Sequence, residues 1–202
     1  MTAGQQVAVP PQRCPSCPRW LTGWGGYWRW LRAPLLVERI WIRRGRCSAC
    51  RRSHALLPDL VLVRRLDAVE VIGASLARKL SQGLGVRPIA EQLDVPHTTV
   101  RSWCHRFQAR SPMLLAQCTA LAVALDGTPV EVNAVGEHAV LASLSVAWQR
   151  ALARFGVRIG DLWSFWSRIS GGQALGTHTT SPWAPGAGAD WIAPVPSGGP
   201  AP

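Results

Sequence analysis

Two Cys-x-x-Cys pairs, Cys14 with Cys17 and Cys47 with Cys50, restrict how this chain can fold more than any other feature. Two thiolates two residues apart can bind a metal ion from one tight turn, and a second such turn completes a tetrahedron of sulfur ligands. A tetrahedral all-sulfur site favours zinc. The cysteines therefore predict a structural Zn²⁺ site, because four protein ligands leave no open position for a substrate or a water.

Two other interpretations of the cysteines stay open. A redox-active Cys-x-x-Cys motif normally begins a helix in a βαβ unit, whereas Pro15 and Pro18 interrupt the first pair. A disulfide framework is typical of secreted proteins, and residues 1–12 contain no apolar core of the length that a signal peptide needs. His54, four residues after Cys50, could replace a ligand. A surface position is the simpler expectation for it.

The charge of the chain indicates a polyanionic partner. The 202 residues carry a formal net charge of +11, and Lys79 is the sole lysine among 22 basic residues. A zinc ion with four bound thiolates would lower that charge to about +9. Such a surplus is typical of proteins that bind nucleic acid or an anionic membrane. No run approaches the roughly 18 apolar residues that span a bilayer, so we expect no membrane insertion.

Tryptophan is unusually frequent, with eleven residues against one tyrosine. Five of them crowd the region of the cysteines: Trp20, Trp24, Trp28, Trp30 and Trp41. A small metal-binding module has little core, and we expect these large side chains to fill it. The alternative is an exposed aromatic platform on which bases stack, as in proteins that bind single strands.

Composition and periodicity divide the chain into five segments. These are a flexible lead at 1–12, a zinc ribbon at 13–57, a helix-turn-helix domain at 64–110, C-terminal helices at 111–169 and a tail at 170–202. The tail is rich in Gly, Pro, Ala, Ser and Thr, and we expect it to be disordered. The order predicts an α+β fold, with a small N-terminal four-cysteine zinc ribbon followed by a mainly α-helical helix-turn-helix domain.

Strand and helix periodicity place the individual elements. The alternation over 35–43 predicts a strand with Ile40 and Ile42 on one face. The glycines at 23, 25 and 26 predict a turn beside a second strand near 27–31. Asp67 is expected to begin a helix, with Glu70 completing a capping box. Apolar spacing then predicts separate helices over 97–108, 113–125, 138–155 and 161–169.

The stretch VRPIAEQLDVPHTTVRSWCHRF fits a helix, a sharp turn and a second helix. Ala90 is informative, because two helices that cross steeply need a small residue where they approach closely. The turn position at Asp94 is usually glycine in such motifs, although aspartate tolerates the left-handed backbone better than most residues. Val100 and Trp103 would form the inner face of the second helix.

This register leaves a row of polar side chains on the outer face of the second helix: His97, Thr98, Arg101, Ser102 and His105. A helix in the major groove presents such positions to base edges. Arg101 is the strongest candidate, because its fork matches guanine O6 and N7. Three further arginines are expected to contact phosphates: Arg87, Arg106 and Arg110. The alternative is an ordinary helical hairpin whose outer face is solvated.

The segments CPSC, CSACRRSHALLPD and GVRPIAEQLDVPHTTVRSWCHRF together carry a family resemblance. They resemble an uncharacterised bacterial family, a domain of unknown function that joins a zinc ribbon to a helix-turn-helix. The pairing is also similar to the N-terminal DNA-recognition region of some insertion-sequence transposases. The resemblance covers about residues 13–110. It implies zinc ligation by the four cysteines and DNA contact by the helix at 97–108.

Catalysis is not expected. A transposase needs a carboxylate cluster that holds two divalent metals, and few acidic residues follow residue 110. Asp126 in ALAVALDGTPVEV could end an apolar strand as in such nucleases, but a turn aspartate before glycine is the simpler interpretation. A truncated transposase without its catalytic domain stays open.

We therefore expect a sequence-specific DNA-binding protein of the bacterial cytoplasm that associates with the nucleoid. It would be a transcriptional regulator or a transposase-derived recognition protein, with double-stranded DNA as partner and no small-molecule substrate. An RNA or single-strand binder that uses the Trp/Arg-rich ribbon is the first alternative. The second is an interaction module or homodimer formed by apolar helices, whose stripe would be Leu141, Leu144, Trp148 and Leu152.

Overall fold

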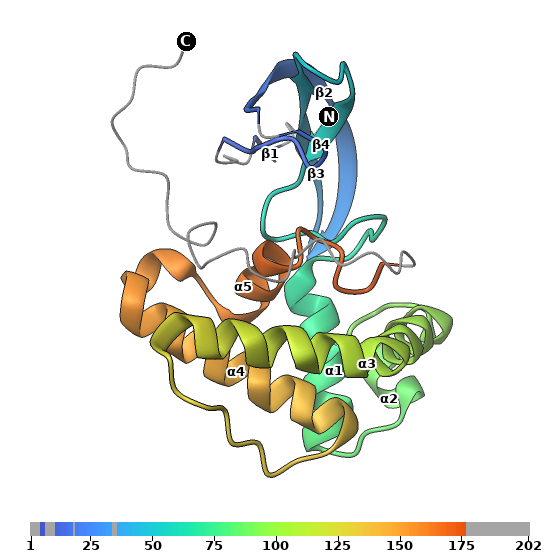
Figure 1. Ribbon diagram of the computed structural model, residues 1–202. Helices are drawn as coiled ribbons and strands as arrows, with labels where there is room; N and C mark the ends of the chain where they lie inside the picture. The colour runs from blue at the N-terminus through green and yellow to red at the C-terminus, as the bar shows by residue number, and fades with distance from the viewer. Residues whose placement is uncertain (1–4, 7–10, 18, 34–35, 177–202) are drawn as a thin grey trace. The chain divides into compact units, whose positions relative to one another are not determined.

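The computed structural model describes residues 5–6, 11–17, 19–33 and 36–176 (Figure 1). They form two compact units that divide between Pro58 and Asp59. The sheet unit comprises the described residues up to Pro58, and the helical unit comprises those from Asp59 to Gly176. None of the helices in the described part of the chain has the length and apolarity needed to cross a bilayer.

The sheet unit is built around β3 (Leu36–Cys47). Strand β2 (Leu21–Ala33) pairs with it antiparallel along one edge. The other edge carries β1 (Gln5–Gln6), which is parallel, and β4 (Ser53–Leu56), which is antiparallel. The strand predicted at 35–43 is therefore confirmed and runs further, because its second half supplies the pairing partner of β4.

Three glycines lie inside β2 and not in a turn beside it, so the turn predicted there is wrong. The pairing register with β3 shifts between Gly23 and Gly26, which places an extra residue on β2. Gly25 in this segment has a φ of 69°, a left-handed conformation that glycine adopts without strain. The segment is a β-bulge, which bends and twists the strand while the pairing continues.

The core of the sheet unit contains little aromatic side chain. Its buried apolar residues, among those described, are Cys14, Leu31, Ile40, Ile42 and Cys47. The expectation that tryptophan fills this core is wrong, because Trp20, Trp24, Trp28 and Trp30 are all exposed. Strand alternation explains the difference for the last two, which point to the sheet face opposite Ile40 and Ile42.

The helical unit contains five α-helices and one 3₁₀ helix among the described residues. In chain order they are α1 (Val69–Ser81), α2 (Val86–Gln92), α3 (His97–Asp126), α4 (Gly136–Phe155), η1 (Gly156–Ile159) and α5 (Leu162–Ile169). The long helices α3 and α4 pack side by side (Figure 1). Fully buried aromatic side chains fill the core: Trp103, Phe107, Phe165 and Trp166.

The helices predicted at 97–108 and 113–125 are one continuous helix, α3, which passes through Pro112. A proline inside a helix removes one N–H and crowds the carbonyl four residues earlier, here that of Gln108. Both Gln108 and Pro112 lie on the exposed side of α3, so solvent can bond the freed carbonyl. The buried side remains continuous, because packing against α4 and the rest of the unit extends on both sides of the proline.

Helix α1 begins one residue later than a capping box would place it. Its N-cap is Ala68, with no side-chain cap, and Asp67 is buried. The prediction that Asp67 is the N-cap of this helix is therefore wrong. Instead, the N–H of Val69 donates to the carbonyl of Leu60 at 2.9 Å, so the preceding loop satisfies the helix terminus.

The last two helices agree with the prediction, and the predicted tail begins too early. Helix α4 includes 138–155, and α5 follows Asp161, whose side chain caps it. Residues 170–176 belong to the helical unit, because Ala174 and Leu175 are buried and Arg65 donates to the carbonyl of Leu175 at 3.0 Å. The rest of the predicted tail, 177–202, lies outside the described residues.

Candidate metal centre and nucleic-acid interface

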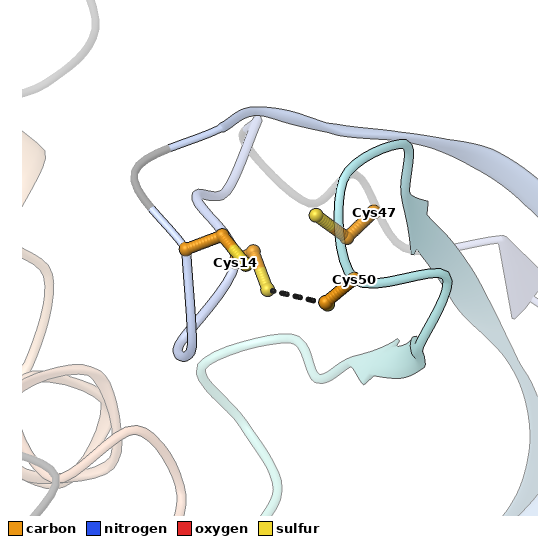
Figure 2. Close-up of side chains that lie close together, drawn as sticks. Cys14, Cys47 and Cys50 are labelled. Atoms are coloured by element: carbon orange, nitrogen blue, oxygen red, sulfur yellow. Dashed lines mark hydrogen bonds between the residues drawn. The ribbon is translucent and has the colours of Figure 1, made fainter.

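The four predicted metal ligands converge in the sheet unit. Their Sγ atoms all lie within 4.8 Å of one another, and Cys14 and Cys50 approach to 3.6 Å with Cys47 beside them (Figure 2). Zinc–sulfur bonds of about 2.3 Å in a tetrahedron place the sulfurs roughly 3.8 Å apart. All six cysteines of the chain are free, so no disulfide competes for these thiols. The four can hold one metal ion in a closed sulfur shell.

Both cysteine pairs lie in tight turns. The first turn is closed by the N–H of Cys17, which donates to the Cys14 carbonyl at 3.3 Å. The second follows β3, and there the N–H of Arg51 donates to the Cys47 carbonyl at 3.0 Å. Arg51 has a φ of 61°, which reverses the chain toward β4. Neither pair begins a helix, so the redox interpretation lacks its usual structural context.

The thiols respond differently to their surroundings. Backbone N–H groups of Cys50 and Ala49 hydrogen-bond the sulfur of Cys47 and lower its pKa to about 7. Hydrogen bonding with Cys50, burial and the charge of that neighbour raise the pKa of Cys17 to about 12. Adjacent thiolates repel one another, so only a bound cation allows all four to ionise together. The electrostatics of the cluster therefore suit a metal ion.

His54 lies closer to the cysteines than a surface histidine would. It is half-buried on β4, and its Nε2 atom is 3.6 Å from the Sγ atom of Cys14. The surface position expected from the sequence is therefore wrong. With four sulfurs already grouped, the imidazole is placed to donate an N–H to a ligating sulfur, as groups outside the ligand shell commonly do.

Helices α2 and α3 pack against each other across a four-residue connection. The inner faces match the prediction, because Ala90 on α2 and both Val100 and Trp103 on α3 are buried. Asp94 has a φ of 51°, the left-handed conformation expected at its turn position. The N–H of Val95 donates to the Ala90 carbonyl at 3.1 Å, which holds the turn against α2.

The predicted base-reading row lies along one side of the first turns of α3. His97, Thr98, Arg101 and His105 are exposed, and Ser102 is half-buried. Arg87 is exposed on α2. A shallow hollow of about 460 Å³ separates it from the start of α3 and is lined by Arg87 and His97. The helix pair thus presents these side chains together on one surface.

The two remaining predicted phosphate contacts are engaged within the helical unit. Arg106 is half-buried, and its Nε atom donates to Ser102 at 3.4 Å. Arg110 donates to the carbonyl of Gly176 at 3.0 Å and contacts the sulfur of Met113. Burial lowers the pKa of the Arg110 guanidinium. Arg110 therefore holds residues 170–176 against α3, a structural role that the sequence did not indicate.

Positive charge is concentrated in the sheet unit. Residues 1–58 carry ten arginines and a single acidic residue, Glu38, whereas residues 59–202 carry twelve basic and ten acidic residues. Such a contrast separates a polyanion-attracting unit from one that is close to neutral. The excess positive charge therefore lies mainly in the sheet unit and much less in the helical unit that contains α3.

Asp126 lies at the end of α3 and not at the end of a strand. Its carboxylate accepts from the N–H of Thr128 at 2.9 Å and pairs with Arg150 at 2.8 Å. Gly127 follows in the left-handed conformation that ends many helices. The carboxylate is thus explained by helix termination, in agreement with the turn interpretation.

The apolar stripe of α4 is largely engaged within its own unit. Leu144 is fully buried, while Leu141 and Leu152 are half-buried. Trp148 donates from its indole N–H to the carbonyl of Gly160 at 2.9 Å. Packing within the helical unit accounts for these contacts. The homodimer stays a prediction.

Comparison with known proteins finds a family model that matches part of the chain. Residues 14–103 match the model of a domain of unknown function (DUF6431). The matched stretch contains all four clustered cysteines, α1, α2 and the start of α3. No curated protein and no solved structure matches the chain. The resemblance to insertion-sequence transposases and a bacterial origin stay predictions.

Proposed function

We propose that the protein binds double-stranded DNA sequence-specifically, with α2 and α3 acting as a helix-turn-helix and the sheet unit as a zinc ribbon. The observation that carries the proposal is the division of α3 into two faces. Val100, Trp103 and Phe107 are buried, whereas His97, Thr98 and Arg101 are exposed on the other side. A recognition helix needs this arrangement, since one face anchors it while the other meets base edges.

Arg101 has the leading role in this proposal. Its guanidinium can donate two parallel hydrogen bonds to O6 and N7 of one guanine, a pattern that distinguishes guanine from the other bases. Thr98 and His105 lie about one turn away on either side and would contact neighbouring bases or phosphates. Arg87 on α2 would contact the phosphate backbone, which fixes orientation without reading sequence.

The proposed zinc ion would be held by the four clustered cysteines. Its contribution is structural, because a closed sulfur shell leaves no site for a substrate. The sheet unit buries few side chains, and small units of this kind usually need a metal or a disulfide to fold. Zinc would thereby position the arginines of β3 and of the turn after it, which we expect to contact phosphates.

The proposal describes a regulator or a recognition protein derived from a mobile element, located with the DNA of the cell. It includes no catalytic step. Both roles require the same two properties, a preferred DNA sequence and a strong dependence of affinity on salt. Both properties can be measured on one selected DNA sequence.

The experiment is selection of bound duplexes from a random pool with the metal-loaded full-length protein, followed by affinity measurements on the enriched sequence at several salt concentrations. Arg101→Ala should cost about 1–3 kcal/mol on that sequence and relax the preference at one position. Arg101→Lys keeps the charge but loses the fork, so it should relax the preference with a smaller loss of affinity. Arg158→Ala removes an exposed arginine of η1 and serves as the matched control.

Either of two results would overturn the proposal. One is binding with a steep salt dependence but no enriched sequence, which would mean only attraction between arginine and phosphate. The other is an enriched sequence that Arg101→Ala and Arg101→Lys leave unchanged. Recognition would then reside elsewhere in the molecule.

A further inference from the structure

One face of the β2–β3 ribbon carries a row of aromatic rings and arginines, and the proposed function assigns no role to the rings. The antiparallel register pairs Trp28 with Trp41 and Trp30 with Arg39, and Arg43 is the next residue of β3 on the same side. Directly paired residues point to the same sheet face. These five side chains, called the tryptophan face, therefore lie together on the side opposite Ile40 and Ile42.

Contacts within the tryptophan face hold its rings in place. The rings of Trp28 and Trp41 meet edge to face, with centroids 5.2 Å apart. The guanidinium of Arg39 lies 5.3 Å from the Trp28 ring and 5.6 Å from the Trp30 ring. The indole of Trp41 also covers Gly26, where a Cβ atom would overlap it. The face is thus an ordered surface rather than a set of independent side chains.

The exposure of this face is not explained by folding. Trp28 is 40% exposed and Trp30 is 55% exposed, although burying an indole is among the largest hydrophobic gains available to a small unit. The core on the opposite side is already filled by aliphatic residues and the metal-site cysteines. Exposed aromatic rings beside arginine indicate a binding surface.

The chemistry of the face favours a nucleic acid over an apolar partner. Arg39 and Arg43 lie among the rings, and the sheet unit carries ten arginines against one acidic residue. A membrane-binding surface would combine tryptophan with exposed aliphatic side chains. Val37, 59% exposed, is the one exposed aliphatic residue of β3 among those described. Indole and guanidinium planes are the groups on which nucleobases stack.

Ring spacing favours unpaired bases over a duplex. Trp28 and Trp30 are two residues apart on one strand, which separates their positions by about 6.7 Å. Bases in a duplex are stacked roughly 3.4 Å apart and present only their edges. Two rings at the wider spacing can each stack on a base only if those bases are splayed apart, as in single strands.

We propose that the tryptophan face binds single-stranded nucleic acid by stacking unpaired bases on Trp28 and Trp30, while Arg39 and Arg43 contact the backbone. Trp41 positions Trp28 through its edge-to-face contact. The tryptophan face belongs to the sheet unit and Arg101 to the helical unit, so the inference does not depend on duplex recognition by Arg101. It extends the proposed function with a second kind of ligand.

The test measures binding of the metal-loaded full-length protein to fluorescent oligo(dT), oligo(U) and a hairpin duplex by anisotropy. Trp30→Leu should weaken binding to the single strands about fivefold or more, because it removes one stacking ring. Trp30→Phe keeps a ring and should retain most of the affinity. The oligo(dT) and oligo(U) arms show whether DNA or RNA is preferred.

Trp24→Leu is the matched control. Trp24 is 53% exposed in the β2 bulge, outside the paired row, with the guanidinium of Arg46 4.4 Å from its ring. The Trp24→Leu variant should bind single strands with an affinity within about twofold of the parent. That change is much smaller than the loss expected when a stacking ring is removed. Metal content and hydrogen exchange of β2 and β3 establish that each variant is folded.

The inference is overturned if the parent protein does not bind the single strands, or if Trp30→Leu binds them as tightly as the parent. It is also overturned if Trp24→Leu loses as much affinity for the single strands as Trp30→Leu. Arg101→Ala separates the two proposals, since it should leave single-strand binding unchanged. If Arg101→Ala leaves the duplex sequence preference unchanged while Trp30→Leu weakens single-strand binding, only the proposed function is overturned.

Discussion

The two units of this protein differ in how their folds are stabilised. The helical unit buries large aromatic side chains between long helices and carries nearly balanced charge. The sheet unit buries few apolar side chains, leaves tryptophans exposed and concentrates arginine. A metal ion bound by four cysteines would replace the missing core. A unit stabilised by a metal would be able to leave its aromatic side chains exposed, because it would not need them for packing.

Metal removal is the strongest way to test this comparison. Stripping the metal, or the Cys50→Ser substitution, should unfold the sheet unit, because a structural zinc ion contributes on the order of 10 kcal/mol to folding. The helical unit should keep its circular dichroism at the helix band. Hydrogen exchange should rise sharply in β2 and β3 but not in α3 and α4.

Cys104→Ala is the control for that experiment, because Cys104 is a buried thiol of the helical unit. It should leave metal content unchanged. Slow exchange of β2 and β3 after complete metal removal would contradict the view that the metal replaces a core.

Gly73→Ala tests the packing of the helical unit. A Cβ atom on this α1 residue would overlap the indole of Trp163 on α5. Overpacking of this kind typically costs about 1–3 kcal/mol. Urea unfolding should show that loss in the helical unit, while the metal affinity of the sheet unit stays unchanged.

The double variant Gly73→Ala with Trp163→Leu supplies the matched test of the cause. If the clash is responsible, the second substitution should cost less in the Gly73→Ala background than in the parent protein. Strict additivity of the two effects would show that the two side chains do not compete for the same space.

The charge contrast predicts which arginines set the salt dependence of nucleic-acid binding. Replacing Arg44 and Arg52 of the sheet unit with alanine should reduce the slope of log affinity against log salt by about two. Over about 50–200 mM salt, that difference amounts to roughly tenfold in affinity. Replacing Arg64 and Arg158 of the helical unit removes the same charge and should leave the slope unchanged. Equal effects from both pairs would remove the contrast between the units.

The smallest expected effect concerns the cap of α5. Asp161 accepts from the N–H groups of Trp163 at 2.8 Å and Ser164 at 3.0 Å. Asp161→Ala should therefore destabilise the helical unit by about 1 kcal/mol. Burial raises the pKa of Asp161, but hydrogen bonds from Ser164 and Trp163 outweigh it, so the net pKa is lowered.

The sign of that shift sets the pH dependence. Because the pKa of Asp161 is lower in the folded state, the ionised carboxylate stabilises the helical unit at pH values above the unfolded-state pKa of about 3.9. This stabilisation is lost as the pH falls through the folded-state pKa. Asp161→Asn keeps the acceptor without the titrating charge. Urea midpoints at neutral pH and near pH 3 should therefore differ less for Asp161→Asn than for the parent. An equal pH response in both proteins would show that this carboxylate does not contribute.

Local patterns predicted the parts of the structure that depend on nearby residues. The paired cysteines indicated their own cluster, because each Cys-x-x-Cys turn places two thiols together and only one further approach is needed. The alternation around Ile40 identified a buried strand face, and the left-handed backbone at Asp94 followed from its place in the turn. These features need little knowledge of the rest of the fold.

Features that depend on distant partners were missed. Asp67 has the pattern of a helix cap, but the loop carbonyl of Leu60 occupies that role at α1. Pro112 falls where two helices were expected to separate, yet packing along the buried side keeps α3 continuous. Arg110 was expected to contact phosphate, but its guanidinium donates to the carbonyl of Gly176 within the same unit. No local sequence pattern predicts any of these three distant contacts.

Residue type and short spacing were enough to predict the four candidate metal ligands, the strand and helix periodicities and the excess of arginine. The tertiary structure alone decided which side chains are free to bind. Whether Trp30 fills a core or faces solvent depends on which sheet face the aliphatic residues occupy. Burial is a property of the whole packed chain, since every residue competes for a limited interior.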